Sequence, residues 1–318
     1  MEITRREMDS RPARIETQMA DIRWRIEQRL DALVPGCSDS PHPLRQAMRY
    51  SLLARGKRIR PVVTVMAATH LGGEESLALD PACAIEMVHT ASLILDDLPC
   101  MDDATLRRGQ PANHLVFGVD TAVLAAMALL NGAYSVISDA RGLSDELRLR
   151  LIHLLAHAVG SEGIIAGQMR DLKETLCWQD CAGLERLHGQ KTGTLFVAAA
   201  ETGARLAGLA EDRLEPIRDF GLKLGLAFQT LDDLLDTSGT VSETGKDVGQ
   251  DGGKASFVAF LGERHARLKV NRLIEAAVAA LAPLAPDSQP LAELAYSLSA
   301  SIGPTGADNQ VALTPSSA

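Results

Sequence analysis

Two segments of the sequence concentrate aspartates in spacings that suit a divalent metal ion. They read LILDDLPCMDD and FQTLDDLLD, and their carboxylates belong to Asp96, Asp97, Asp102, Asp103, Asp232, Asp233 and Asp236. In a helix, residues 232 and 236 are one turn apart and share a face. One acidic cluster alone would equally suit a solvated helix end, but the second favours a cage of facing carboxylates. Oxygen ligands without histidine or cysteine predict Mg²⁺, completed by substrate phosphates, rather than an enclosed Ca²⁺.

Basic residues beside glycines indicate what such metal ions would hold. They lie in GKRIRP, in LRRG after the first acidic cluster, and farther along the chain, and they are Lys57, Arg60, Arg107, Arg108, Lys191, Lys246 and Lys254. Arginine offers a planar fork to phosphate oxygens and lysine a point charge, so separate basic and acidic portions can seat two anionic groups. Each basic residue taken singly would be interpreted as a solvated surface charge.

Helices must position these residues, because the sequence has a helical period and few strand signals. Apolar residues recur at spacings of three and four, and the chain has only two Trp, three Tyr and six Phe. We therefore expect an all-α fold in one domain at residues 13–302, since no repeat or Pro/Gly-rich linker divides the chain. Residues 1–12 and 303–318 are expected to be disordered.

Local signals predict where several helices begin and end. Asp80 and Pro81 are typical of an N-cap followed by proline at the first helical position, and predict a helix that runs into the first acidic cluster. Helical patterns also cover residues 114–140, 144–159, 183–207 and 256–284. The N-terminal helix is expected to end at Pro35 and Gly36.

Composition excludes several classes of protein. The chain has 46% apolar and 23% charged residues, which is typical of a globular domain, and its net charge of −9 disfavours nucleic-acid binding. The longest uninterrupted apolar run, residues 122–130, is only nine residues long, so we expect no membrane span. The first eighteen residues lack the apolar core of a secretory signal. Five cysteines without a C-x-x-C pair are interpreted as free thiols of a cytoplasmic protein.

The motifs and their order resemble the trans-isoprenyl diphosphate synthases, and among them the bacterial geranylgeranyl diphosphate synthases of carotenoid pathways. The resemblance covers residues 40–262 and rests on GKRIRP, DDLPCMD, LRRGQP, GQMRDL, KTG, FQTLDDLLD and GKDVGQDGGK. Seven motifs in the family's order are highly specific. The resemblance implies an all-α barrel of antiparallel helices around a deep central cavity, usually as a homodimer.

The resemblance also implies roles for individual residues. About three Mg²⁺ ions would clamp the diphosphate of a farnesyl, geranyl or dimethylallyl substrate, and their ligands would be Asp96, Asp97, Asp102, Asp232, Asp233 and Asp236. The side chains expected to contact this diphosphate are Arg107, Lys191, Lys246 and Lys254. The metal-free pocket for isopentenyl diphosphate would be formed by Lys57, Arg60, His89 and Arg108. Without the resemblance, His89 would be interpreted as a core histidine.

The implied reaction is a head-to-tail condensation. Departure of the diphosphate would leave an allylic cation, which the double bond of isopentenyl diphosphate attacks before a proton is lost. Thr192, Gln229 and the carbonyl of Lys191 would face the cation with the negative ends of their dipoles, and Phe228 would pack on isopentenyl diphosphate. The product would be five carbons longer than the allylic substrate.

Product length is expected to depend on the helix that carries Asp96. In related farnesyl-producing synthases, a bulky aromatic residue four or five positions before the first aspartate blocks the cavity. The residues here are Ser92 and Ala91, and Val88 lies farther back on the same helix. The absence of a bulky side chain favours a C20 product, although longer products stay open because partner helices set the end of the cavity.

Two other classes of protein would share some of these features. A class I terpene cyclase would have one aspartate-rich motif in common, but DDLLD and GKRIRP argue against it. A non-catalytic subunit would be expected to have lost an aspartate or a diphosphate-binding lysine, and none is missing. Two departures from the family pattern are Ala104-Thr105 in place of acidic residues, and the absence of any Lys or Arg after Arg272. The second departure leaves open how the isopentenyl diphosphate pocket closes.

Overall fold

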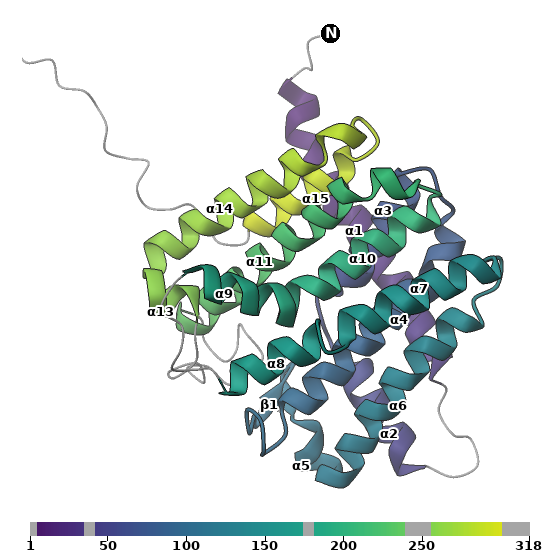
Figure 1. The fold of residues 1–318 in the computed structure, drawn as a ribbon, viewed down its shortest axis with the longest axis vertical. Coiled ribbons are helices and arrows are strands. Elements are labelled where there is room, and N and C mark those ends of the chain that lie inside the picture. Colours follow the sequence, from purple (N-terminus) through teal and green to yellow (C-terminus); the bar gives the residue numbers. More distant parts are fainter. Residues whose placement is uncertain (1–4, 35–41, 174–180, 239–255, 301–318) are drawn as a thin grey trace, which may run out of the picture.

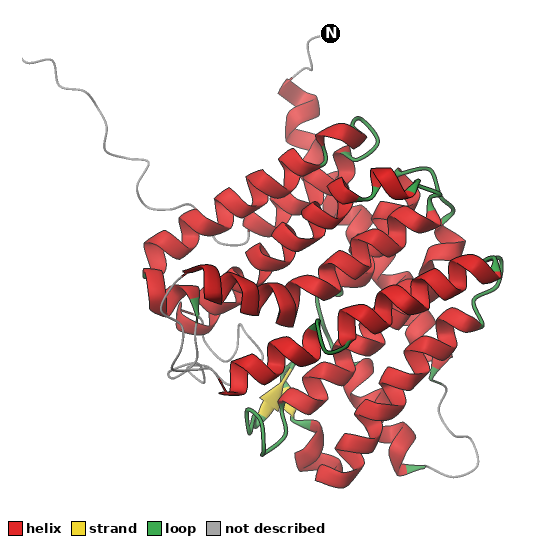
Figure 2. Ribbon diagram, viewed as in Figure 1, coloured by secondary structure: helices red, strands yellow, loops and turns green. Residues whose placement is uncertain are grey.

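The computed structural model describes residues 5–34, 42–173, 181–238 and 256–300, and nearly all of them are helical (Figure 2). The α-helices are α1 (Arg5–Leu33), α2 (Pro43–Leu52), α3 (Ile59–His70), α4 (Glu75–Asp96), α5 (Asn113–Phe117), α6 (Val119–Ser138), α7 (Asp145–Val159), α8 (Ile164–Lys173), α9 (Cys181–His188), α10 (Thr194–Leu206), α11 (Glu215–Ser238), α13 (Phe257–Leu261), α14 (Glu263–Ala280) and α15 (Gln289–Ala300). The other elements are the π-helix η1 (Gly189–Gly193), two 3₁₀ turns (Glu211–Arg213 and Ala282–Leu284) and the strands β1 (Leu106–Arg107) and β2 (Gln110–Pro111). The expected all-α fold is confirmed.

Helix α4 runs through the middle of the molecule (Figure 1). It packs against α1, α3, α6 and α10, while α11 packs against α10 and α14. The two helices that carry the acidic clusters, α4 and α11, are therefore both neighbours of α10. Most side chains of α4 are buried, including Ile85, Met87 and Val88, which is typical of a helix surrounded by others.

Helix α1 begins earlier than the sequence predicts. Its apolar face is buried as expected, through Ile15, Met19, Ile22, Ile26 and Leu30. However, the helix starts at Arg5, inside the segment 1–12 that we expected to be disordered. The residues before Ile15 are mostly polar in sequence, so apolar periodicity gives no signal of a helix there. The segment 303–318 lies outside the described residues.

Three other predicted helix boundaries are wrong. Helix α4 starts at Glu75 and has Pro81 inside it. Asp80 does not cap the helix but accepts hydrogen bonds from Arg29 of α1 at 2.5 and 3.0 Å. The predicted helix over residues 114–140 is broken at Gly118, whose φ is 88°. The one over residues 256–284 is broken at Gly262, whose φ is 78°. Only glycine adopts such values readily, and the chain changes direction there.

Among the residues that the structure describes, length and hydropathy alone would allow three segments to cross a membrane. They are Glu75–Asp96, Val119–Ser138 and Asp145–Lys173. The longest uninterrupted apolar run in the sequence does not reveal these segments, because isolated polar residues divide each of them. In the first segment, 67% of the most apolar 18-residue stretch is buried inside the protein, as expected of a central helix.

Candidate active site

The first acidic cluster forms a tight turn at the end of α4. The helix ends at Asp96, and the chain then folds back so that the backbone N–H of Asp102 donates to the carbonyl of Asp96 at 2.9 Å. The N–H of Ala104 similarly donates to the carbonyl of Asp97 at 3.2 Å, and Asp103 takes a left-handed conformation with φ of 48°. The turn therefore holds Asp96 and Asp102 near each other.

Burial and like charge act together on Asp96. Its pKa is raised to about 6, chiefly by burial; Lys191 and Arg107 partly oppose the rise, and Asp102 and Asp97 add to it. A carboxyl group in this environment is poorly stabilised as an anion by the protein alone. A bound cation would supply the missing stabilisation.

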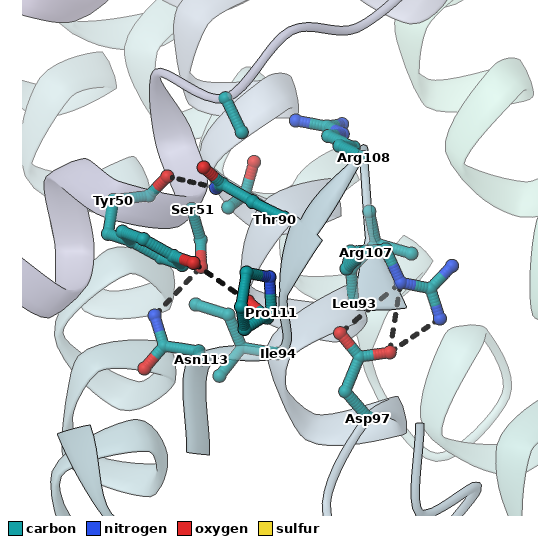
Figure 3. Close-up of a pocket in the computed structure, with 12 residues that line it drawn as sticks. Tyr50, Ser51, Thr90, Leu93, Ile94, Asp97, Arg107, Arg108, Pro111 and Asn113 are labelled. Atoms are coloured by element: carbon teal, nitrogen blue, oxygen red, sulfur yellow. Dashed lines mark hydrogen bonds and ion pairs between the residues drawn. The ribbon is translucent and has the colours of Figure 1, made fainter. Parts of the chain in front are cut away.

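Asp97 and Arg107 bind each other in this structure. The Nε of Arg107 donates to Oδ1 of Asp97 at 2.9 Å and its Nη2 to the same oxygen at 2.5 Å (Figure 3). Arg107 lies in the short hairpin formed by β1 and β2, where it pairs with Gln110. The residues between them, Arg108 and Gly109, have φ of 55° and 78°, as a type I′ turn requires. As a result, Arg107 and Arg108 point to different sides of the hairpin (Figure 3).

Lys191 and Thr192 lie in the π-helix η1, where the sequence predicted ordinary helix. Such a bulge is common at functional sites because it re-aims side chains. The Nζ of Lys191 donates to Asp171 of α8 at 2.5 Å. Gly167 makes the close approach possible, since a Cβ on it would lie 2.3 Å from the backbone nitrogen of Lys191. Burial lowers the pKa of Lys191, but Asp96 and Asp171 raise it more, so the lysine stays charged.

The second acidic cluster is linked to η1 through Gln229. The hydroxyl of Thr192 donates to Oε1 of Gln229 at 2.7 Å, and Nε2 of Gln229 donates to Asp233 at 2.9 Å. Asp233 also accepts from the backbone N–H of Phe257 at 3.3 Å. Asp236 is buried near the end of α11. Because Lys191 is also attracted to Asp96, η1 connects the two acidic motifs.

A cluster of basic side chains around His89, which is the predicted isopentenyl diphosphate pocket (the basic pocket), adjoins this arrangement. The guanidinium of Arg60 lies 4.5 Å from the ring centre of Phe196 and 5.6 Å from that of Phe228, and its Nη1 is 3.2 Å from Nε2 of His89. Lys57 lies 5.8 Å from the centre of the Phe228 ring. Burial lowers the pKa of Arg60 to about 10, against the opposing effects of Glu86 and Asp232.

His89 is neutral in this pocket. Burial lowers its pKa well below the ordinary value, and Arg60 and Arg108 lower it further. The pocket therefore combines positive charge with a neutral imidazole. The structure thus brings together the four residues predicted to bind isopentenyl diphosphate, while their roles stay a prediction.

An apolar cavity runs along α4 from Asp96. Its volume is about 260 Å³, and the α4 side of its wall includes Val88, Ala91, Ser92 and Asp96. Leu95 also lines it from α4, and the remaining wall comes from Met101, Leu130, Val159, Ile164, Ile165, Gln168, Met169 and Leu172. The sequence does not predict this second group, because residues on other segments give no signal of which cavity they face. The cavity extends along α4 from residue 88 to residue 96, which is about 12 Å of helix.

The donor set fits magnesium better than a metal held by protein alone. Within the described residues, no three His, Cys, Asp or Glu side chains come close enough to hold a metal ion. Mg²⁺ commonly takes one or two carboxylates and completes its shell with water and substrate phosphates. The raised pKa of Asp96 marks the carboxylate that most needs such a cation. Lys246 and Lys254 lie outside the described residues.

Comparison with known proteins places this geometry in a family. The polyprenyl synthetase family model matches residues 41–283. The chain is 48% identical over 214 residues to geranylgeranyl pyrophosphate synthase 7, chloroplastic, of Arabidopsis thaliana, a match that covers 66% of this chain and 62% of that relative. The chain thus spans somewhat less than two thirds of that relative's length.

Solved structures share the fold over most of the chain. An FPP/GFPP synthase from Zymomonas mobilis has a TM-score of 0.80 at 32% identity, and the match covers 91% of this chain and 100% of that one. A geranyltransferase from Helicobacter pylori, complexed with magnesium and isoprenyl diphosphate, has a TM-score of 0.81 at 32% identity, and the match covers 89% of this chain and 96% of that one.

Proposed function

We propose that this chain, which belongs to the polyprenyl synthetase family, condenses isopentenyl diphosphate with an allylic diphosphate to give geranylgeranyl diphosphate. The observation that carries the proposal is the juxtaposition of three features. An acidic end of α4 faces the charged Lys191, a basic pocket lies beside Phe228, and an apolar cavity leads away from Asp96.

Mg²⁺ is part of the proposal, and the family resemblance supports about three ions. When bound, Mg²⁺ would stabilise the negative charge that develops on the leaving diphosphate. Asp96 and Asp102 on one side and Asp232 and Asp236 on the other would hold it. Asp97 and Asp233 stay predicted ligands, although Arg107 and Gln229 bind them here.

The side chains of this protein have distinct tasks in the reaction. Lys191, kept charged by Asp96 and Asp171, donates hydrogen bonds to the departing diphosphate. Gln229 turns its amide nitrogen to Asp233 and its oxygen to Thr192, so these contacts fix the orientation of the amide beside the allylic carbon. The basic pocket binds the second diphosphate without a metal, and the apolar wall excludes water from the cation.

A C20 product is the finer part of the proposal. Ala91 and Ser92 leave the cavity open where an aromatic side chain would end it. The names of the relatives, which are geranylgeranyl pyrophosphate synthases, support C20. The Zymomonas mobilis protein of similar fold is instead an FPP/GFPP synthase, so a farnesyl or longer-chain product is the alternative.

The state and setting of the protein are proposals as well. A homodimer is supported by exposed apolar side chains on α5 and α6, which are 46–60% exposed and comprise Leu115, Val116, Val119, Leu124 and Met127. A cytoplasmic location is supported by the free thiols of Cys83, Cys100 and Cys181. The motif resemblance supports a role in supplying carotenoid synthesis.

One experiment tests the proposed reaction. Purified protein is incubated with isopentenyl diphosphate and each of the dimethylallyl, geranyl and farnesyl diphosphates, with Mg²⁺ or EDTA, and products are identified by mass spectrometry. We expect a C20 diphosphate that requires Mg²⁺, and loss of turnover by several orders of magnitude in Asp232→Ala. Product formation that is indifferent to EDTA, or no product from any allylic substrate, would refute the proposal.

A further inference from the structure

Glu86 is a buried acid that the proposed reaction does not use. It lies on α4, about one helical turn before His89, and is only 1% exposed. Its Oε1 accepts from Nη1 of Arg58 at 2.5 Å and from Nη2 of Arg108 at 3.1 Å. Burial raises the pKa of Glu86, but Arg108 and Arg58 lower it more, so the carboxylate is ionised. A buried carboxylate shared by two arginines joins three separate parts of the chain.

Both arginines are held in unusual backbone conformations. Arg58 has φ of 50° and Arg108 has φ of 55°, and residues with a Cβ adopt such backbone angles only at a cost in conformational energy. Arg58 also donates through Nη2 to the carbonyls of Leu52 and Ala54 at 2.8 and 2.7 Å. Arg58 thereby fixes the segment between α2 and α3 to Glu86.

Arg108 lies tightly between Glu86 and that same segment. A Cβ on Gly56 would lie 3.2 Å from the guanidinium carbon of Arg108, so glycine leaves room for its side chain. Glu86 engages Nη2 of Arg108, and the buried Nη1 has no hydrogen-bond partner among the described residues. The Nε of Arg60 is likewise buried and has no hydrogen-bond partner within the described part of the chain. Two guanidinium groups of the basic pocket thus keep a donor for an anion.

We propose that Glu86 is a positioning residue that holds Arg108 ready to bind the diphosphate of isopentenyl diphosphate, an inference that rests on the proposed function. Without its charge, Arg58 and Arg108 would repel each other across a buried space. Arg108 would then turn away from the pocket. Binding of isopentenyl diphosphate would weaken, while the allylic diphosphate site at Asp96 and Lys191 would keep its ligands.

The test compares Glu86→Gln with a matched control. Glu201 is also buried, at 3% exposure, and accepts from Arg205 and Arg218 at 2.8 Å each, but these partners are outside the basic pocket. Steady-state kinetics are measured at saturating allylic diphosphate and Mg²⁺. We expect Glu86→Gln to raise KM for isopentenyl diphosphate at least tenfold, with kcat and KM for the allylic substrate within threefold of wild type. Glu201→Gln should leave all three constants within threefold.

A second variant covers the case in which Glu86→Gln does not fold. The pair Glu86→Gln with Arg58→Met leaves no uncompensated charge at position 58, where burial is complete, and exchanges of this kind are often tolerated. It still removes the carboxylate from Arg108, so the same tenfold rise in KM is expected. An unchanged KM in either folded variant, or an equal rise in Glu201→Gln, would overturn the role of Glu86. A wild-type protein without prenyl transfer would instead refute the proposed function.

Discussion

Replacing Asp96 by asparagine should stabilise the metal-free protein while it abolishes turnover. Burial, helped by two neighbouring aspartates, raises the pKa of Asp96 from 3.8 to about 6 because it disfavours the charged form. At about 1.4 kcal/mol for each pKa unit, ionised Asp96 costs the fold about 3 kcal/mol. Asparagine has nearly the same shape and no charge, so it removes this cost.

The effect has a defined dependence on pH. A carboxyl group whose pKa is raised by folding stabilises the fold below its unfolded pKa, and that contribution is lost as pH rises through the folded value. The advantage of Asp96→Asn should therefore be about 3 kcal/mol at pH 8 and about half of that at pH 5. Urea unfolding in EDTA, followed by circular dichroism at both pH values, measures it.

Metal and substrate analogue should reverse the order. With Mg²⁺ and inorganic pyrophosphate, the wild type gains the stabilisation that ligand binding provides, and the variant gains little. A variant that is less stable than wild type at pH 8 in EDTA would refute the reasoning, because Asp96 would then be a structural residue rather than one held at a cost for metal binding.

Three further substitutions test other parts of the site. Ala91→Tyr places a ring in the cavity and should shift the product toward C15, measured by mass spectrometry; an unchanged product would mean that other helices set its length. Gly167→Ala brings a Cβ to 2.3 Å from the nitrogen of Lys191 and should lower kcat at least tenfold without changing the product, so a normal kcat would contradict the role of η1. Asp171→Asn leaves Lys191 without its 2.5 Å charged partner and should raise KM for the allylic diphosphate, whereas KM for isopentenyl diphosphate should stay within threefold.

The sequence predicts the helices better than their interruptions. The helix expected over residues 144–159 is present, and the hydroxyl of Ser144 caps it by accepting from the N–H of Leu147 at 3.2 Å. Asp80 is also typical of an N-cap but binds Arg29 of α1, a contact that depends on the tertiary fold. The π-helix at Lys191 has no local signal either, and its close contact with Gly167 of α8 is a tertiary one.

The motifs predict site residues but not the partners of these residues in the fold. The spacing of the aspartates predicts Asp96 and Asp232 as ligands of one kind, whereas Arg107, expected on a substrate, binds Asp97 here. The motif GQMRDL suggests no role for its residues, and the structure connects it to Lys191 through Asp171. Glu86 has no signal of its own, since a single acid among apolar residues does not reveal which arginines will reach it.

A crystal structure with Mg²⁺, isopentenyl diphosphate and a non-reactive thio analogue of farnesyl diphosphate would test directly whether the two acidic motifs act on one diphosphate. We expect carboxylates of Asp96 and Asp232 to bind metal ions on the same diphosphate, with metal–oxygen distances of about 2.0–2.1 Å, and the prenyl chain to lie along Ala91 and Val88. Metal ions on separate anions, or a prenyl chain outside this cavity, would contradict this expectation.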